Sequence, residues 1–109
     1  MIPTRTAIFV ATAPVDLRRS FDGLAAIASD ALQGDPQSGA LFLFFGRRRD
    51  RLKLLWWDRT GFCLLYKRLE RGVFRVPGPL HPGDASVSIS AVELARILEG
   101  VDLPVTRIG

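Results

Sequence analysis

Residues 41–69 read LFLFFGRRRDRLKLLWWDRTGFCLLYKRL, and this stretch decides the fold. Its apolar runs at 41–45, 52–57 and 62–69 are too short for typical helices and are separated by short polar segments rich in turn residues. The stretch therefore predicts three antiparallel strands joined by hairpins. The first run is continuously apolar, which is typical of a central strand covered on both faces.

Side chains of the second and third runs alternate between the two faces of the predicted sheet. In the second run, one face receives Leu52, Leu54 and Trp56, and the other receives Lys53, Leu55 and Trp57. In the third run, Phe62, Leu64 and Tyr66 lie opposite Cys63, Leu65 and Lys67. Because both faces carry apolar groups, helices must cover one of them, or part of it is a contact site.

The segment before residue 41 predicts one strand and one helix. Residues 7–11 form a short apolar, partly β-branched run, which indicates a buried strand. Residues 22–32 carry apolar side chains at helical spacing, with Ser20 or Asp22 as the N-cap and Gly34 in the position of the C-terminal cap. This pattern predicts an amphipathic helix.

The segment after residue 69 predicts another strand and a second helix. A short strand over 87–89 is followed by Ser90 and Glu93, which have the spacing of a capping box. The helix ends at Gly100. Its expected buried side chains are Ala91, Leu94, Ala95 and Leu98. The predicted fold class is α+β, a mainly antiparallel sheet built from consecutive hairpins with two amphipathic helices.

Composition limits the class of protein. A chain of 109 residues with 48% hydrophobic residues predicts a single globular domain spanning 1–109. No apolar run approaches the roughly 20 residues that span a bilayer, and residues 1–5 do not resemble a signal peptide, so we expect a cytoplasmic protein without a membrane partner. One cysteine, Cys63, and one histidine, His81, cannot supply a disulfide or a structural zinc site. We also find no Walker or Rossmann motif, so no cofactor is expected.

A metal-dependent nuclease would need clustered carboxylates. The candidates are Asp16, Asp22, Asp50 and Asp58. A helix cap explains Asp22, hairpin turns explain Asp50 and Asp58, and a salt bridge with Arg18 or Arg19 explains Asp16. Cys63 lies in an apolar strand and His81 in a loop between prolines, so neither indicates nucleophilic catalysis. We therefore expect no catalytic residues, no metal site and no enzymatic activity.

Positive charge is concentrated between residues 46 and 75, where ten lysines and arginines face three acidic residues. The candidate binding residues are Arg47, Arg48, Arg49, Arg51, Lys53, Trp57, Lys67, Arg68, Arg71 and Arg75. The four arginines at the tip of the first hairpin are expected to be exposed, where guanidinium groups can contact phosphates. Contact with DNA, contact with an acidic protein surface and simple solvation all remain open for this loop. Trp57 shares a face with Lys53, so it either stacks on an unpaired base, anchors a protein interface or packs under a helix.

A family resemblance covers nearly the whole chain. It rests on PVDLR at 14–18, FDGL at 21–24, DP at 35–36 with SG at 38–39, GRR at 46–48 with DRLK at 50–53, LWWD at 55–58, GF at 61–62, KRLE at 67–70, GVF at 72–74 and LEGVD at 98–102. In this ordered series the chain resembles the short TnpB-type accessory proteins, encoded by the second open reading frame of a bacterial insertion-sequence family. These proteins are unrelated to the RNA-guided nucleases that share the TnpB name.

The resemblance implies a protein encoded beside a separate, larger transposase, which assists movement of the element and carries no assigned catalytic residues. With the arginine loop, this context makes DNA the expected partner and that transposase the alternative one, and the oligomeric state is left open. The chain departs from the family pattern at Arg59, where glycine is common, and at Arg19 and Ser20, where lysine and glycine are common.

Overall fold

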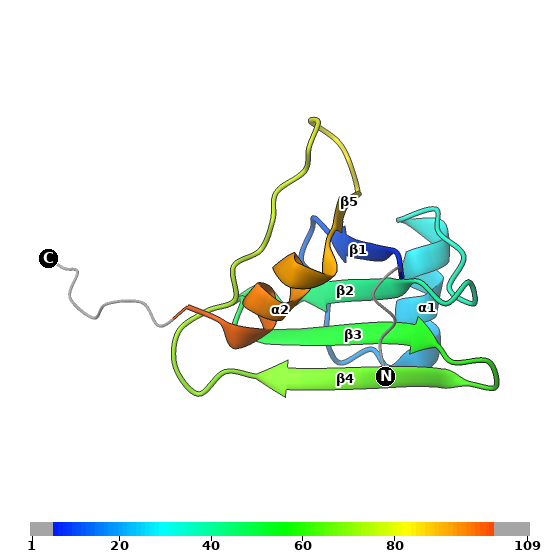
Figure 1. Ribbon diagram of the computed structural model, residues 1–109, viewed down its shortest axis with the longest axis horizontal. Helices are drawn as coiled ribbons and strands as arrows, with labels where there is room; N and C mark the ends of the chain where they lie inside the picture. Colours follow the sequence, from blue (N-terminus) through cyan, green and yellow to red (C-terminus); the bar gives the residue numbers. More distant parts are fainter. Residues whose placement is uncertain (1–5, 102–109) are drawn as a thin grey trace, which may run out of the picture.

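The computed structural model describes residues 6–101 as one sheet with a helix on each face (Figure 1). The strands are β1 (Ile8–Ala11), β2 (Leu41–Phe45), β3 (Arg51–Trp57), β4 (Phe62–Arg68) and β5 (Ser86–Ile89), and the helices are α1 (Phe21–Asp30) and α2 (Ala91–Glu99). The strand order is β4-β3-β2-β1-β5. Residues 1–5, which were compared with a signal peptide, lie outside the described residues. So does Asp102, the last residue of the LEGVD motif.

The three strands predicted from residues 41–69 are confirmed. β2 pairs antiparallel with β3, and β3 with β4, through short hairpins. The other two strands join differently: β1 lies parallel to β2, with α1 in the connection, and β5 lies antiparallel to β1 at the far edge. The fold is therefore α+β and mainly antiparallel, as predicted, but only β2, β3 and β4 are consecutive hairpins.

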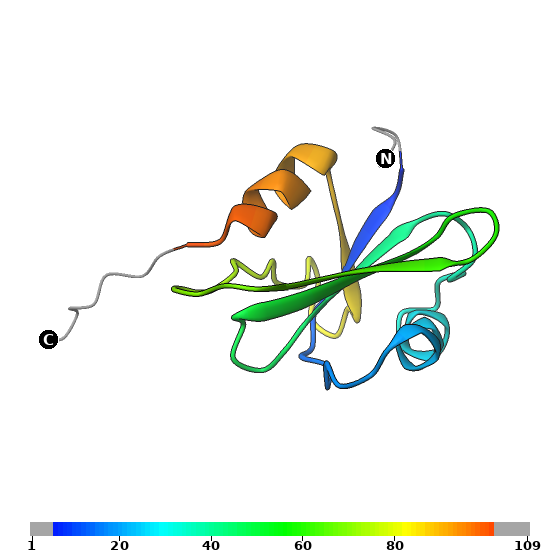
Figure 2. The same ribbon diagram turned by 90° about the horizontal axis from the view of Figure 1, so that it is seen from below.

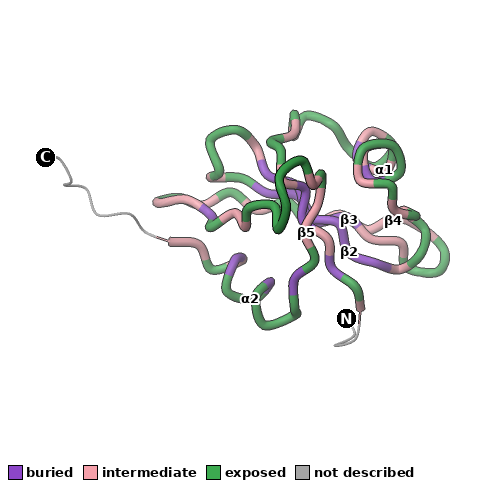
Figure 3. Tube along the Cα trace, turned by 90° about the horizontal axis from the view of Figure 1, so that it is seen from above, coloured by how far each residue is buried: buried purple, intermediate pink, exposed green. Residues whose placement is uncertain are grey.

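The two helices lie on opposite faces of the sheet (Figure 2). Leu24 and Ala28 of α1 pack in a cluster with Phe42, Phe44 and Leu55. On the other face, Leu94 and Ile97 of α2 pack in a cluster that includes Ile8, Val10, Leu41, Leu43, Phe45, Leu52, Leu54 and Phe74. All of β2 is consequently buried, and Figure 3 shows burial concentrated in the central strands. Each such side chain contributes about 1.5–3 kcal/mol through removal from water.

The start of α2 confirms the predicted capping box. The Glu93 amide donates to the Ser90 hydroxyl at 3.1 Å, and the Ser90 amide donates to the Glu93 carboxylate at 2.8 Å. The predicted buried face is partly wrong, because Ala91 and Ala95 are exposed whereas Ile97 is buried beside Leu94. The larger side chains of Leu94 and Ile97 fill the space over the sheet, so the helix turns its alanines toward solvent.

The caps at both ends of α1 differ from the prediction. The helix ends at Asp30, its cap residue is Ala31, and the Ser20 side chain makes no capping hydrogen bond. Gly34 lies beyond the helix, where its amide donates to the Ala28 carbonyl at 2.8 Å. A Cβ at Gly34 would lie 2.8 Å from Cε1 of Phe42, so close packing on β2 requires this glycine.

Gly34→Ala should therefore destabilise the fold. The Phe42 ring is fully buried and has little room to move, so overpacking should cost about 1–3 kcal/mol in the free energy of unfolding. Gly78→Ala is the matched control, since nothing lies within 4 Å of a Cβ there, and its effect should stay within about 0.5 kcal/mol. Urea denaturation followed by tryptophan fluorescence measures both. Equal effects would contradict the packing role of Gly34.

Arg59→Gly should stabilise the fold. Arg59 has a φ of 55°, a left-handed conformation that costs a residue with a Cβ about 1–2 kcal/mol, which accounts for the glycine common there in the resembling family. After the entropic cost of glycine, a gain of about 0.5–1 kcal/mol remains. Arg47→Gly relieves no such strain and should be neutral or destabilising in the same denaturation experiment. A loss of stability in Arg59→Gly would contradict the strain argument.

Candidate nucleic-acid interface

The hairpin between β2 and β3 presents the predicted arginines. Its backbone closes through hydrogen bonds from the Gly46 amide to the Arg51 carbonyl, 3.2 Å, and from the Arg49 amide to the Gly46 carbonyl, 3.0 Å. Arg49 adopts a φ of 63° to complete the turn. As predicted from the sequence, Arg47, Arg48, Arg49 and Arg51 are all exposed.

The segment after β4 fixes this hairpin from outside. The Leu69 amide donates to the Asp50 carbonyl at 2.8 Å, and the Phe74 amide donates to the Arg49 carbonyl at 2.7 Å. Phe74 is itself buried in the core on the α2 face. The arginine side chains therefore extend from a backbone that is held in place, which lowers the entropic cost of using them together.

The turn after β1 packs against the same hairpin. The Val15 amide donates to the Phe45 carbonyl at 2.8 Å, and Leu17 lies against Gly46. Between the two segments is a hollow of about 300 Å³, which we call the arginine hollow. It is lined by Asp16, Leu17, Arg18, Gly46, Arg47, Arg48, Asp50, Arg51 and Tyr66.

Sequence reasoning missed two members of the arginine hollow, Arg18 and Tyr66. The sequence predicts the segment 14–19 as a salt-bridged turn rather than part of a site. For Arg18 the available signal was the parallel connection: when β1 and β2 run in the same direction, the segments that follow them meet at one edge of the sheet. For Tyr66 the signal was the register of the predicted hairpin, which pairs it with Lys53, two residues from Arg51. A sheet built only from consecutive hairpins, as predicted, would not bring residues 14–18 next to the arginine hairpin.

Asp16 and Arg18 form the salt bridge that the sequence suggested. Nε of Arg18 donates to both carboxylate oxygens at 3.0 and 3.1 Å, and Nη2 donates at 2.8 Å. Hydrogen bonding from Arg18 lowers the pKa of the Asp16 carboxyl to about 2, and the same contact raises the pKa of Arg18. The carboxylate stays ionised above that pH and partly neutralises Arg18.

Lys53 and Lys67 both donate to backbone carbonyls, Lys53 in the interior and Lys67 at a half-buried position. Lys53 is only 7% exposed, and its ammonium donates to the Arg19 carbonyl at 2.7 Å. The Lys67 ammonium donates to the Leu98 carbonyl at 2.6 Å. Its positive charge stabilises the C-terminal end of α2, where the helix dipole is negative. Each lysine therefore links its strand to another segment of the chain through a backbone carbonyl.

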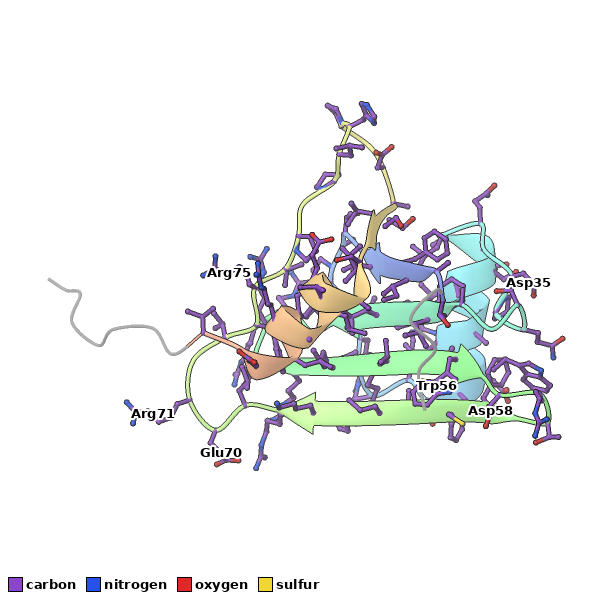
Figure 4. The ribbon with its side chains drawn as sticks, in the orientation of Figure 1. Asp35, Trp56, Asp58, Glu70, Arg71 and Arg75 are labelled. Carbon is purple, nitrogen blue, oxygen red and sulfur yellow. The ribbon has the colours of Figure 1, made fainter. Side chains whose placement is uncertain are left out.

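Of the remaining candidate residues, Trp57 lies away from the arginine hairpin, whereas Arg68 is the cross-strand partner of Arg51. Trp57 lies six residues along β3 from Arg51, about 20 Å away, and packs edge-on against Phe62 with ring centroids 5.0 Å apart. Arg68 pairs with Glu70 at 3.3 Å. Figure 4 places Trp56 and Asp58 at one end of the sheet and Glu70 and Arg71 at the other. Trp57 is thus separated from the basic candidate residues, which lie at the end of the sheet with the arginine hairpin.

Arg75 borders a second cavity, on the α2 face, with a volume of about 400 Å³. We call it the α2 cleft. It is lined by Arg75, Pro77, Ile89, Glu93, Arg96, Ile97 and Val101. Glu93 is already committed to the capping box, so two arginines surround a mainly apolar floor.

Residues 6–101 contain neither a cluster of metal ligands nor a membrane-spanning helix. Nowhere in that range do three or more histidine, cysteine or acidic side chains come together to hold a metal ion. No helix among these residues has the length and apolar character needed to cross a membrane.

Comparison with known proteins places the chain. It matches the family described as "IS66 Orf2 like protein" over residues 6–107. It is 41% identical over 95 residues to "Uncharacterized protein y4jC" of Sinorhizobium fredii (strain NBRC 101917 / NGR234), covering 87% of this chain and 79% of that protein. It is 36% identical over 104 residues to "Uncharacterized protein y4hO" of the same organism, covering 94% and 88%. No solved structure matches the chain significantly.

The family match agrees with the resemblance found in the sequence motifs and extends over nearly all of the described fold. It supports an accessory role associated with transposition. The chain belongs to the family of IS66 Orf2-like proteins, and not to the RNA-guided nucleases that share the TnpB name.

Proposed function

We propose that this transposition accessory protein binds DNA through the arginine hollow, without catalysing a reaction. The observation that carries the proposal is the convergence of Arg18 with Arg47, Arg48 and Arg51 around one cavity. Guanidinium groups bind phosphate oxygens in a two-pronged geometry, so a cluster of this kind suits a nucleic-acid backbone.

The loop arginines are the ones available to a phosphate. Within residues 6–101, Arg47, Arg48 and Arg51 form no salt bridge, whereas Arg18 is held by Asp16. Their side chains are exposed on a hairpin whose backbone is fixed at Arg49 and Asp50. Phosphate contacts of this type supply affinity and orientation and carry little sequence information.

The salt dependence of DNA binding tests the proposal. If three or four arginines contact phosphates of a duplex, log K should fall against log salt with a slope of about −3 to −4. Arg47→Ser with Arg48→Ser should weaken binding at least tenfold and reduce the slope by about 2. Fluorescence anisotropy with a labelled duplex measures both quantities.

Arg75→Ser with Arg96→Ser is the matched control for charge. It removes the same two positive charges from exposed positions at the α2 cleft. Equal weakening by both double variants would mean that binding follows net charge and not the arginine hollow. Absence of salt-sensitive binding to any DNA would exclude the proposed function.

The second candidate function is a protein adaptor that binds the separate transposase without contacting DNA. The α2 cleft favours it, because Ile89, Ile97 and Val101 provide an apolar floor beside two arginines. A cleft of this composition fits an acidic segment that also carries apolar side chains. In another form of the adaptor, the loop arginines themselves meet acidic residues of the transposase.

Co-purification with the transposase of the same element distinguishes these forms. If the α2 cleft holds the transposase, Arg75→Ser with Arg96→Ser should reduce the co-purified transposase at least tenfold, and Arg47→Ser with Arg48→Ser should not. The opposite result would assign the transposase to the arginine hollow. Retention in both folded variants would contradict both forms of the adaptor.

A further inference from the structure

Tyr66 is an exposed aromatic residue within the arginine hollow. It projects from β4 on the face covered by α1, and 52% of its surface is exposed. It lines the hollow together with Arg47, Arg48 and Arg51. Its ring is therefore accessible from solvent beside the arginines, and an aromatic ring in that position can pack against a flat ligand.

Lys53 supports the Tyr66 ring from within the protein. The two residues are cross-strand partners, and the Lys53 ammonium lies 4.7 Å from the ring centroid. That ammonium is fixed by its hydrogen bond to the Arg19 carbonyl. A buried cation on one side of the ring holds it through a cation–π contact and leaves the rest of the ring for a ligand.

We infer that the arginine hollow takes an unpaired nucleotide of DNA, whose base stacks on Tyr66 while the loop arginines hold the neighbouring phosphates. The inference rests on the proposed function and deepens it, because it specifies single-stranded or locally opened DNA as the ligand. Aromatic side chains beside a cationic groove are the usual platform for unpaired bases. In an intact duplex the bases are stacked on one another, so their faces do not reach a ring inside a hollow.

The distances favour Tyr66 as the stacking residue over Trp57, for which the sequence had left base stacking open as one alternative. Trp57 lies about 20 Å from Arg51 along β3, and its ring already contacts Phe62. Tyr66 pairs with Lys53, only two residues from Arg51. The phosphate contacts and the stacked base therefore belong to one site only if Tyr66 is the platform.

Binding of one labelled oligonucleotide, single-stranded and as a duplex, tests the inference with the full-length protein at one salt concentration. The single strand should bind more tightly than the duplex. Tyr66→Leu should reduce single-strand affinity about tenfold and change duplex affinity less than twofold. Tyr66→Phe retains the ring and should bind as the unaltered protein does. Trp57→Leu is the aromatic control and should leave the preference for single strands intact.

A photochemical experiment avoids any dependence on the folding of these variants. A single strand containing 5-iodouracil, irradiated with the unaltered protein, should cross-link to Tyr66, as located by mass spectrometry of tryptic peptides. A cross-link at Trp57 instead, or no change of single-strand affinity in folded Tyr66→Leu, would overturn the inference. Salt-sensitive duplex binding without a preference for single strands would overturn it while leaving the proposed function in place. Failure to bind either DNA would exclude both.

Discussion

The need to cover both faces of β2 governs this fold. Its five apolar side chains point alternately to the two faces, and all are buried. One helix satisfies one face, so the chain needs α1 before β2 and α2 after β5. Placing α1 between β1 and β2 makes those strands parallel, because a crossover helix returns the chain to the same end of the sheet. The position of the arginine hollow follows from that pairing.

The parallel pair brings the turn at 14–18 to the hairpin that follows β2, and backbone hydrogen bonds fix the contact. The Val15 amide bonds β2 at Phe45, and the amides of Leu69 and Phe74 bond the hairpin carbonyls of Asp50 and Arg49. These bonds join separate parts of the chain around a loop with four arginines. Mutual repulsion among the guanidinium groups is tolerated because they are solvated and partly screened. The fold thus holds together a charge cluster that would disperse in a flexible loop.

Much of this architecture can be predicted from the sequence. Where the prediction fails, the causes are physical. Apolar runs and turn residues between 41 and 69 predict β2, β3 and β4, and the Ser90 capping box predicts the start of α2. Local patterns do not predict how distant strands pair, so the parallel contact of β1 with β2 was missed, and Arg18 with it. Charge counting also cannot tell that Lys53 and Lys67 bond to backbone carbonyls, since burial depends on which strands are neighbours.

Local strain alone does not distinguish the arginine hairpin from the hairpin between β3 and β4. Arg49 and Arg59 both adopt left-handed backbone conformations at hairpin turns, yet only the Arg49 hairpin is bonded to the turn at 14–18 and to the segment after β4 through long-range backbone contacts. What separates the two hairpins is the cavity that these contacts create beside Tyr66. The α2 cleft lies on the other face of the sheet, so a ligand in the arginine hollow and a partner at the α2 cleft would not compete for the same surface.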